Sequence, residues 1–228
     1  IEASEVKIQE PVQCPLGTSM TVKNLFFKIP ARRNFLKSIS VETRHIVEEF
    51  QRIALAYPSV AFTLVNNGNE LYKLDPTDFK NRIAEVLEIG DKSELIPLNE
   101  HTNFVAINGF AGSPKLAKRT RGEQYFFVNG RFIRDNYFNH AVMGAYDGLI
   151  DKEQFPSYVV FFEIEPTRID VNVHPSKTEI KFEDSRDIYA VLKSVVRKSL
   201  GAFNLIPAAP NELGAFNPIP SNINLKSD

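Results

Sequence analysis

The densest group of positively charged side chains lies in one stretch between Ser113 and Arg134. Six cations less the acid Glu123 give this stretch a net charge of +5. A basic loop of this kind can neutralise the phosphates of a nucleic-acid backbone. A solvent-exposed loop with no nucleic-acid partner is the alternative interpretation of the same charge pattern. The candidate DNA-binding residues are Lys115, Lys118, Arg119, Arg121, Arg131 and Arg134.

A second unusual segment is DVNVHPSK, from Asp170 to Lys177. Val171 and Val173 alternate with polar residues, which predicts a strand whose polar side chains share the opposite face. Pro175 then stiffens a loop that presents Lys177, and a lysine ammonium can act as a point charge toward a phosphate. A strand end with a solvent-facing lysine is the alternative interpretation.

The sequence lacks the motifs of a self-contained enzyme. It contains no G-x-S-x-G elbow, no H-E-x-x-H and no G-x-x-x-x-G-K-[ST] loop. Cys14 is the one cysteine, so neither an internal disulfide nor a cysteine-based zinc site can form. We therefore predict no catalytic residue and no metal ligand in this chain.

The elements that must position these residues follow from local patterns. Asn66-Asn67-Gly68-Asn69 predicts a hairpin turn, and Pro30 suits the first turn of a helix. Ser40 is expected to cap a second helix, and Thr77 or Asp78 a third that Gly90 ends. Strands are predicted over residues 20–27, 60–65, 70–74, 95–98, 104–110, 123–128, 158–163, 169–173 and 179–182, and helices over 31–37, 41–57, 77–89, 134–150 and 185–200. Strands and helices alternate imperfectly, so the fold class is α+β or mixed α/β.

Composition and length limit the class of protein. The 228 residues are 24% charged and 43% hydrophobic with a net charge of -1, which excludes a collagen, a mostly disordered chain and a uniformly basic protein. No apolar run approaches the ~20 residues that span a bilayer, so we expect no membrane partner. The chain begins with Ile1 in a strand-like stretch, which suggests a fragment of a longer protein.

The domain organisation is read from the order of the elements. A hairpin closes one unit near Asp75 and a new α/β series then begins, so we predict domains over 1–75 and 76–200. Residues 201–228 contain four prolines and no periodic pattern, which predicts a disordered linker.

Three segments together resemble the DNA mismatch repair MutL family. They are GTSMTVKNLFFKIPARRNFL (17–36), FVNGRFIRD (127–135) and DVNVHPSKTEIKF (170–182). The resemblance spans residues 16–200, and its third motif is the most specific. It implies that residues 1–75 end an ATPase domain of the gyrase, chaperone, histidine-kinase and MutL class. It also implies that residues 76–200 form a transducer domain with a ribosomal protein S5 domain 2-like fold.

The resemblance also assigns site residues. Gly17 and Thr18 match the motif that closes the nucleotide pocket, and Lys177 matches the family lysine that reaches the ATP γ-phosphate. A positively charged groove for DNA is expected on the transducer, where Arg131 and Arg134 lie on the matching segment. The family's catalytic Glu, Mg²⁺-binding Asn, adenine site and lid have no equivalent in this sequence. Hydrolysis of ATP by this fragment alone is therefore not expected.

The same resemblance implies cofactors and partners. ATP and Mg²⁺ are expected in the intact protein, with neither bound by this fragment. The expected partners are DNA, the mismatch-recognition protein MutS and a second copy in the ATP state, in the bacterial cytoplasm near the nucleoid. Two alternatives stay open: a stand-alone nucleic-acid or protein binding module, and the transducer of a related type II topoisomerase. An ATPase domain encoded upstream of Ile1 would decide against the stand-alone module.

Overall fold

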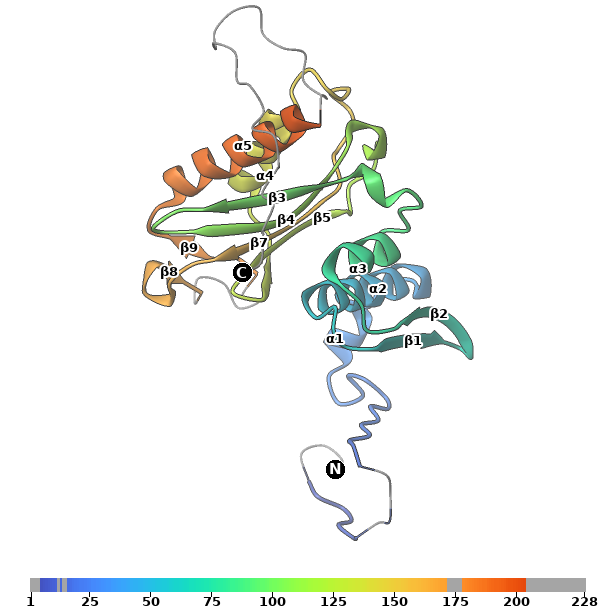
Figure 1. Cartoon of the computed structure of the whole chain (residues 1–228). Coiled ribbons are helices and arrows are strands. Elements are labelled where there is room, and N and C mark those ends of the chain that lie inside the picture. The colour runs from blue at the N-terminus through green and yellow to red at the C-terminus, as the bar shows by residue number, and fades with distance from the viewer. Residues whose placement is uncertain (1–4, 12, 14–15, 172–177, 204–228) are drawn as a thin grey trace, which may run out of the picture. The chain divides into compact units, whose positions relative to one another are not determined.

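The computed structural model describes residues 5–11, 13, 16–171 and 178–203, and Figure 1 shows its helices and strands. The chain divides into two compact units, residues 1–51 and 52–228. Each unit is described by itself. The predicted linker from residue 204 onward lies outside the described residues.

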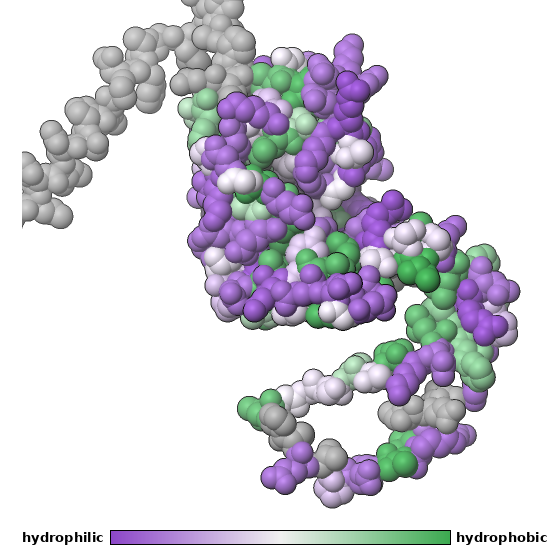
Figure 2. Space-filling view, turned by 90° about the vertical axis from the view of Figure 1, so that its right-hand side faces the viewer, coloured by the Kyte–Doolittle hydropathy of each residue, from purple (hydrophilic) through white to green (hydrophobic). Residues whose placement is uncertain are grey.

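The first unit contains the short helix α1 (Pro30–Asn34) and most of α2 (Ile39–Ala56). Pro30 begins α1 as predicted. The strand predicted over residues 20–27 is wrong, because this segment forms a bend and turns. Asn24 and Phe26 have φ values of 51° and 63°, which an extended strand does not tolerate. Apolar side chains such as Phe35 are exposed along this unit, and green residues follow its extended segment in Figure 2.

Helix α2 begins one residue before the predicted cap. The carbonyl of Ser38 accepts from the backbone N–H groups of Val41 and Glu42, both at 3.0 Å. The Glu42 carboxylate in turn accepts from the backbone N–H of Lys37 at 2.7 Å. Ser40 therefore lies in the first turn of the helix and does not cap it. The bond from Lys37 N–H to the Glu42 carboxylate closes the start of the helix on the N-terminal side of Ser40.

The second unit opens with a hairpin of β1 (Phe62–Asn66) and β2 (Asn69–Leu74). Its predicted turn is confirmed: Asn67 and Gly68 have φ values of 51° and 82°, as a tight hairpin turn requires. Helix α3 (Phe79–Val86) follows, and Asp78 caps it by accepting from the backbone N–H of Asn81 at 2.9 Å. Helix α3 ends earlier than Gly90, because Glu88 takes a left-handed conformation with φ 55°.

Arg82 on α3 joins the hairpin to the rest of the unit. Its side chain is fully buried, and Nη2 donates to three backbone carbonyls. These are the oxygens of Pro58 and Val60, both at 2.9 Å, and of Asp75 at 2.8 Å. One guanidinium thus holds the chain on both sides of the hairpin.

A five-stranded mixed sheet forms the centre of this unit (Figure 1). Its order is β3-β4-β7-β5-β6, and β5 and β7 form its parallel pair while the other neighbours are antiparallel. Helix α4 lies in the connection between β5–β6 and β7, as a parallel crossover requires. The strands are β3 (Leu95–His101), β4 (Ala106–Gly112), β5 (Gln124–Val128), β6 (Arg131–Ile133) and β7 (Tyr158–Glu163). Strand β6 was not predicted from the sequence.

Two helices, α4 (Asn136–Ala145) and α5 (Ser185–Ala202), pack on one face of the sheet. Alternate residues of β5 and β7, such as Phe126 and Phe162, meet Phe138 of α4 in this core. On the other face, Phe161 stacks with Phe127 at 4.5 Å and meets Phe79 of α3 at 4.7 Å. The mixed α+β class predicted from the sequence is confirmed.

The remaining elements are short. The pair β8 (Ile169–Asp170) and β9 (Lys181–Phe182) forms a separate antiparallel ladder. The turns η1 (Lys92–Glu94), η2 (Pro114–Leu116) and η3 (Pro166–Arg168) are 3-10 helices. None of the helices in the described ranges has the length and apolar character that crossing a membrane requires.

Candidate nucleic-acid interface and nucleotide-contact loop

The basic loop begins where β4 ends, and its first lysine is held by an acid. Lys115 Nζ lies 2.7 Å from the Glu94 carboxylate on η1. The same carboxylate accepts a hydrogen bond from the Ser113 hydroxyl. The hydrogen bonds from Lys115 and Ser113 lower the pKa of Glu94, and the bond to Glu94 raises the pKa of Lys115. Lys115 is thus partly neutralised before any phosphate approaches.

Lys118 is paired in the same way with Glu123. Glu123 also accepts from the Ser157 hydroxyl at 2.5 Å, which fixes the carboxylate at the start of β7. The backbone of Lys118 bridges Phe155 through hydrogen bonds of 3.0 and 2.8 Å. The loop is therefore attached to the sheet at two points, and two of its lysines face carboxylates.

Arg119 and Arg121 lie between these attachments. Both are exposed, and the Arg121 guanidinium lies 4.5 Å from the centre of the Phe155 ring. Within the described part of the chain, neither arginine forms an ion pair with a carboxylate. Both arginines are therefore available to bind a phosphate. The guanidinium of Arg121 lies over the face of the ring, so the N–H groups along its edge can still donate hydrogen bonds.

Arg131 lies at the opposite end of β5 from this loop. Asn129 and Gly130 form a hairpin turn with φ values of 49° and 79°, and Arg131 pairs with Val128 at the end of the strand. Four residue steps separate Gln124 from Val128, which is about 13 Å along a strand. Arg134 follows β6, where its backbone N–H donates to Thr178 at 2.8 Å. The structure therefore divides the six predicted cations between the two ends of β5 and does not gather them in one cluster.

Asn129 has a structural role that the sequence reasoning missed. Its side-chain amide donates to the Ile164 carbonyl at 2.8 Å and accepts from the Ile164 N–H at 3.0 Å. The turn of the FVNGRFIRD segment is thus tied to the end of β7. An Asn before Gly in a turn signals only local conformation, so no sequence pattern identifies this long-range contact.

Asp135, the last residue of that segment, caps α4. Its carboxylate accepts from the backbone N–H of Phe138 at 2.9 Å. Burial raises the pKa of Asp135 despite this hydrogen bond. The helix that covers the sheet is therefore anchored directly after Arg134.

Lys177 and its neighbours from residue 172 lie outside the described residues. The stem that carries them is described: Ile169 pairs with Phe182 and Asp170 with Lys181. Arg168 stabilises this stem through an ion pair of 2.6 Å with Asp184. The segment from 171 to 180 thus connects two paired strands that end at the start of α5.

Gly17 and Thr18 belong to the first unit. Both are exposed and lie outside the helices and strands of the described chain, and Gly17 has a φ of 148°. Among the residues that the structure describes, no cluster of metal-ligating side chains was found.

Comparisons with known proteins relate this geometry to a family. The model of the DNA mismatch repair protein, C-terminal domain, matches residues 83–201. The MutL protein of Christiangramia forsetii is 52% identical over 207 residues, 91% of this chain and 34% of that protein. The MutL protein of Flavobacterium johnsoniae is 50% identical over 91% of this chain and 32% of its own length. The chain thus spans about a third of the curated relatives it matches.

Solved structures agree with this relationship. The Aquifex aeolicus MutL ATPase domain complexed with ADP is similar with a TM-score of 0.51 and 28% identity, over 64% of this chain and 52% of that chain. The N-terminal domain of a DNA repair protein has the same fold, with a TM-score of 0.65 and 18% identity over 79% of this chain and 60% of that chain. Family model, sequence identity and fold together show that the chain belongs to the MutL family of DNA mismatch repair proteins.

Proposed function

We propose that this chain couples the nucleotide state of the intact protein to dimerisation and DNA binding. The observation that carries the proposal is the pairing of β8 with β9, the two strands between which Lys177 lies in the sequence. In this role Lys177 contacts the ATP γ-phosphate, so its charge favours the triphosphate state. The related ATPase domain solved with ADP supports a nucleotide ligand for the intact protein.

The division of labour follows from the proposed domains. Residues 1–75 end the ATPase domain, 76–200 form the transducer, and 201–228 form a linker. Gly17 and Thr18 help to close the nucleotide pocket of the intact protein, where ATP and Mg²⁺ bind. This chain alone binds and hydrolyses no ATP in our proposal, because it carries none of the catalytic residues.

The DNA-binding surface includes both ends of β5. At one end Arg119 and Arg121 bind phosphates. Lys115 and Lys118 contribute when a DNA phosphate replaces Glu94 or Glu123 as their ion-pair partner. At the other end Arg131 and Arg134 extend the contact along the duplex. DNA, MutS and a second copy of the protein are the partners, in the bacterial cytoplasm near the nucleoid.

The test is Lys177→Ala in the intact protein, with Lys73→Ala on β2 as the matched control. We expect the Lys177 variant to lose ATP-dependent dimerisation in sedimentation experiments and to hydrolyse ATP more slowly, while Lys73→Ala behaves as wild type. Equal hydrolysis rates and equal dimerisation in both variants would show that Lys177 does not sense the nucleotide.

A further inference from the structure

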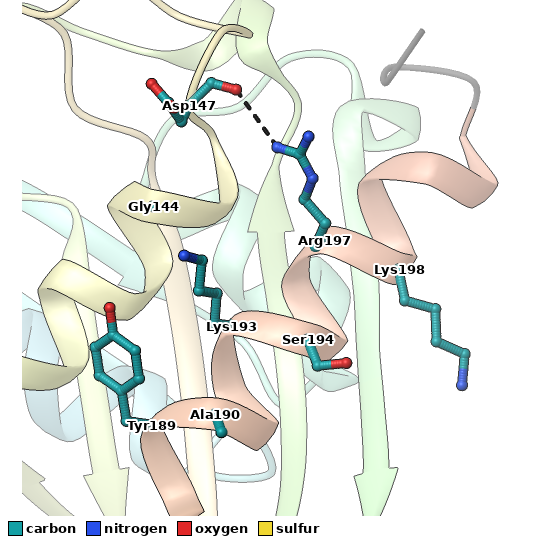
Figure 3. A pocket seen from close by; sticks show the side chains of 8 residues that line it. All are labelled: Gly144, Asp147, Tyr189, Ala190, Lys193, Ser194, Arg197 and Lys198. Atoms are coloured by element: carbon teal, nitrogen blue, oxygen red, sulfur yellow. Dashed lines mark hydrogen bonds between the residues drawn. The ribbon is translucent and has the colours of Figure 1, made fainter. Parts of the chain in front are cut away.

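A groove runs between α4 and α5 on the surface that faces away from the sheet (Figure 3). Its α5 wall carries Tyr189, Lys193, Arg197 and Lys198, and its α4 wall includes Gly144. From Tyr189 to Lys198 the wall is about 13 Å long, since a helix rises 1.5 Å per residue. None of the residues that line this groove belongs to the basic segment of residues 113–134.

Lys193 lies along α4 because residue 144 is a glycine. A Cβ atom at Gly144 would lie 3.3 Å from Cε and 3.4 Å from Nζ of Lys193, closer than most packed side chains allow. Lys193 is exposed, and in the described residues its ammonium forms no ion pair with a carboxylate. Its charge is therefore held in the groove without being neutralised.

Arg197 serves the structure of the groove. Its Nη1 donates to the carbonyl of Ala145, the last residue of α4, at 3.1 Å. It also donates to the carbonyl of Asp147, two residues further on, at 3.4 Å (Figure 3). These bonds satisfy carbonyls that a helix end leaves without partners. Lys198, one position on, makes only a long 3.4 Å pair with Glu100 and its side chain is 74% exposed. Lys193 and Lys198 are thus the two cations that a ligand can recruit.

A pair of stacked aromatic rings, one of which lines the groove, lies toward the N-terminal ends of the two helices. Tyr189 stacks on Tyr137 of α4 with ring centres 4.4 Å apart. The Tyr189 hydroxyl also lies 2.8 Å from Nδ1 of His140, which fixes the plane of the stack. Tyr137 as a residue is 45% exposed, so it reaches solvent while one side of its ring packs on Tyr189.

We propose that the α4–α5 groove binds single-stranded nucleic acid. A base stacks on Tyr137, and the phosphates that follow contact Lys193 and Lys198, which is the combination of platform and cations that single-strand binding uses. An acidic peptide uses the lysines but gains nothing from the exposed ring. A paired duplex keeps its bases stacked inside the helix, away from the tyrosine. This site goes beyond the proposed function, because it requires neither ATP nor the surface at β5.

The experiment measures binding of the full chain to fluorescent oligo(dT) and to a duplex of equal length, by anisotropy over a range of salt. The variants are Lys193→Glu and Tyr137→Leu, with Lys73→Glu on β2 as the charge-matched control. We expect Lys193→Glu to weaken single-strand binding and to reduce the slope of log affinity against log salt by about 0.7 or more. Tyr137→Leu should weaken single-strand binding about fivefold or more at an unchanged salt slope.

Three outcomes would overturn the proposal. In the first, Lys193→Glu and Lys73→Glu bind oligo(dT) equally well. In the second, Lys193→Glu weakens duplex and single strand by the same factor, which assigns the lysine to general phosphate attraction. In the third, a poly-glutamate peptide displaces oligo(dT) and Tyr137→Leu has no effect, which assigns the groove to an acidic protein segment. Thermal unfolding of each variant confirms that it is folded.

Discussion

Lys115 and Glu94 form an ion pair of 2.7 Å that joins the basic loop to the turn before β3. This pair places an acid inside a surface that we propose for DNA. The local charge is therefore lower than the sequence of the loop indicates, because Glu94 precedes Lys115 by 21 residues and was not counted with it.

Replacement of this acid should strengthen DNA binding. Glu94→Gln frees Lys115 for phosphate, so we expect tighter duplex binding and a steeper salt dependence in anisotropy titrations. Glu85→Gln on α3 removes the same charge outside the loop and serves as the control. Equal affinities for the two variants would count against a DNA role for Lys115.

The lowered pKa of Glu94 also makes stability depend on pH. The ionised Glu94 carboxylate stabilises the folded chain above the ordinary pKa of 4.5, and this stabilisation is lost as the pH falls through the folded pKa.

The two arginines of the loop should contribute most of its DNA affinity. Arg119→Gln combined with Arg121→Gln should weaken duplex binding and reduce the salt slope by about 1.8, or about 0.9 for each phosphate that the variant no longer neutralises. Arg186→Gln, at the start of α5, removes one positive charge outside the loop and shows how much a change in net charge alone alters the slope. An unchanged salt slope in the double variant would remove this loop from the DNA-binding surface.

Arg82 should be essential for the stability of the hairpin. Arg82→Ala leaves the carbonyls of Pro58, Val60 and Asp75 without their shared donor in a buried site, so we expect a loss of about 3 kcal/mol in the free energy of unfolding by urea. Arg82→Lys keeps a charge but cannot reach all three oxygens, and should be intermediate. A wild-type midpoint for the alanine variant would show that water replaces the guanidinium at no cost.

Asp135 should make stability depend on pH in the opposite direction from Glu94. Its pKa is raised in the folded chain, so the folded state binds the proton more tightly and stability falls as the pH rises from the ordinary value of 3.8 to the folded value. Asp135→Asn keeps a capping oxygen and should flatten this slope in urea titrations that begin below the ordinary value of 3.8 and extend to neutral pH. Asp135→Ala loses the cap and should be about 1 kcal/mol less stable than Asp135→Asn at all of these pH values, because neither side chain titrates. A slope that survives in the asparagine variant would assign it to another group.

Two glycines with similar backbones allow a test of close strand packing. A Cβ atom added at Gly109 would lie 2.2 Å from the carbonyl oxygen of Val159 on β7. A Cβ atom added at Gly122 would have no such neighbour within 4 Å. Their φ values are 149° and 144°, so the backbone strain of an alanine is nearly the same at both. Gly109→Ala should therefore cost at least about 2 kcal/mol more than Gly122→Ala in urea unfolding. Equal losses would mean that β4 and β7 separate easily.

Much of the fold could be predicted from the sequence because local signals decide its elements. Tyr158–Glu163 was predicted with its observed bounds, and the Asn67-Gly68 turn was identified from residue types that favour a positive φ. The strand predicted at residues 20–27 failed because β propensity does not supply a partner strand. Strand β6 was missed for the opposite reason, since its partner β5 creates it.

The candidate site was harder to predict because its organisation is tertiary. The cations of residues 113–134 form one cluster in sequence but occupy both ends of β5 in space. Glu94 and Glu123 became part of the loop through contacts with Lys115 and Lys118. The groove between α4 and α5 carries no sequence motif, since its tyrosine and lysines come from helical positions that resemble any solvated face.

The amide of Asn129 ties two separate parts of the second unit together. Its side chain forms two hydrogen bonds with the backbone of Ile164, as a neighbouring strand would. These bonds connect the β5–β6 turn to the residues that lead to the β8–β9 stem. Ile164 lies five residues before Ile169, where the stem begins, so these bonds join the turn that bears Arg131 to the chain that leads into the stem. Asn129 thus lies between the segment that carries the proposed nucleotide sensor and the turn that carries a proposed DNA contact.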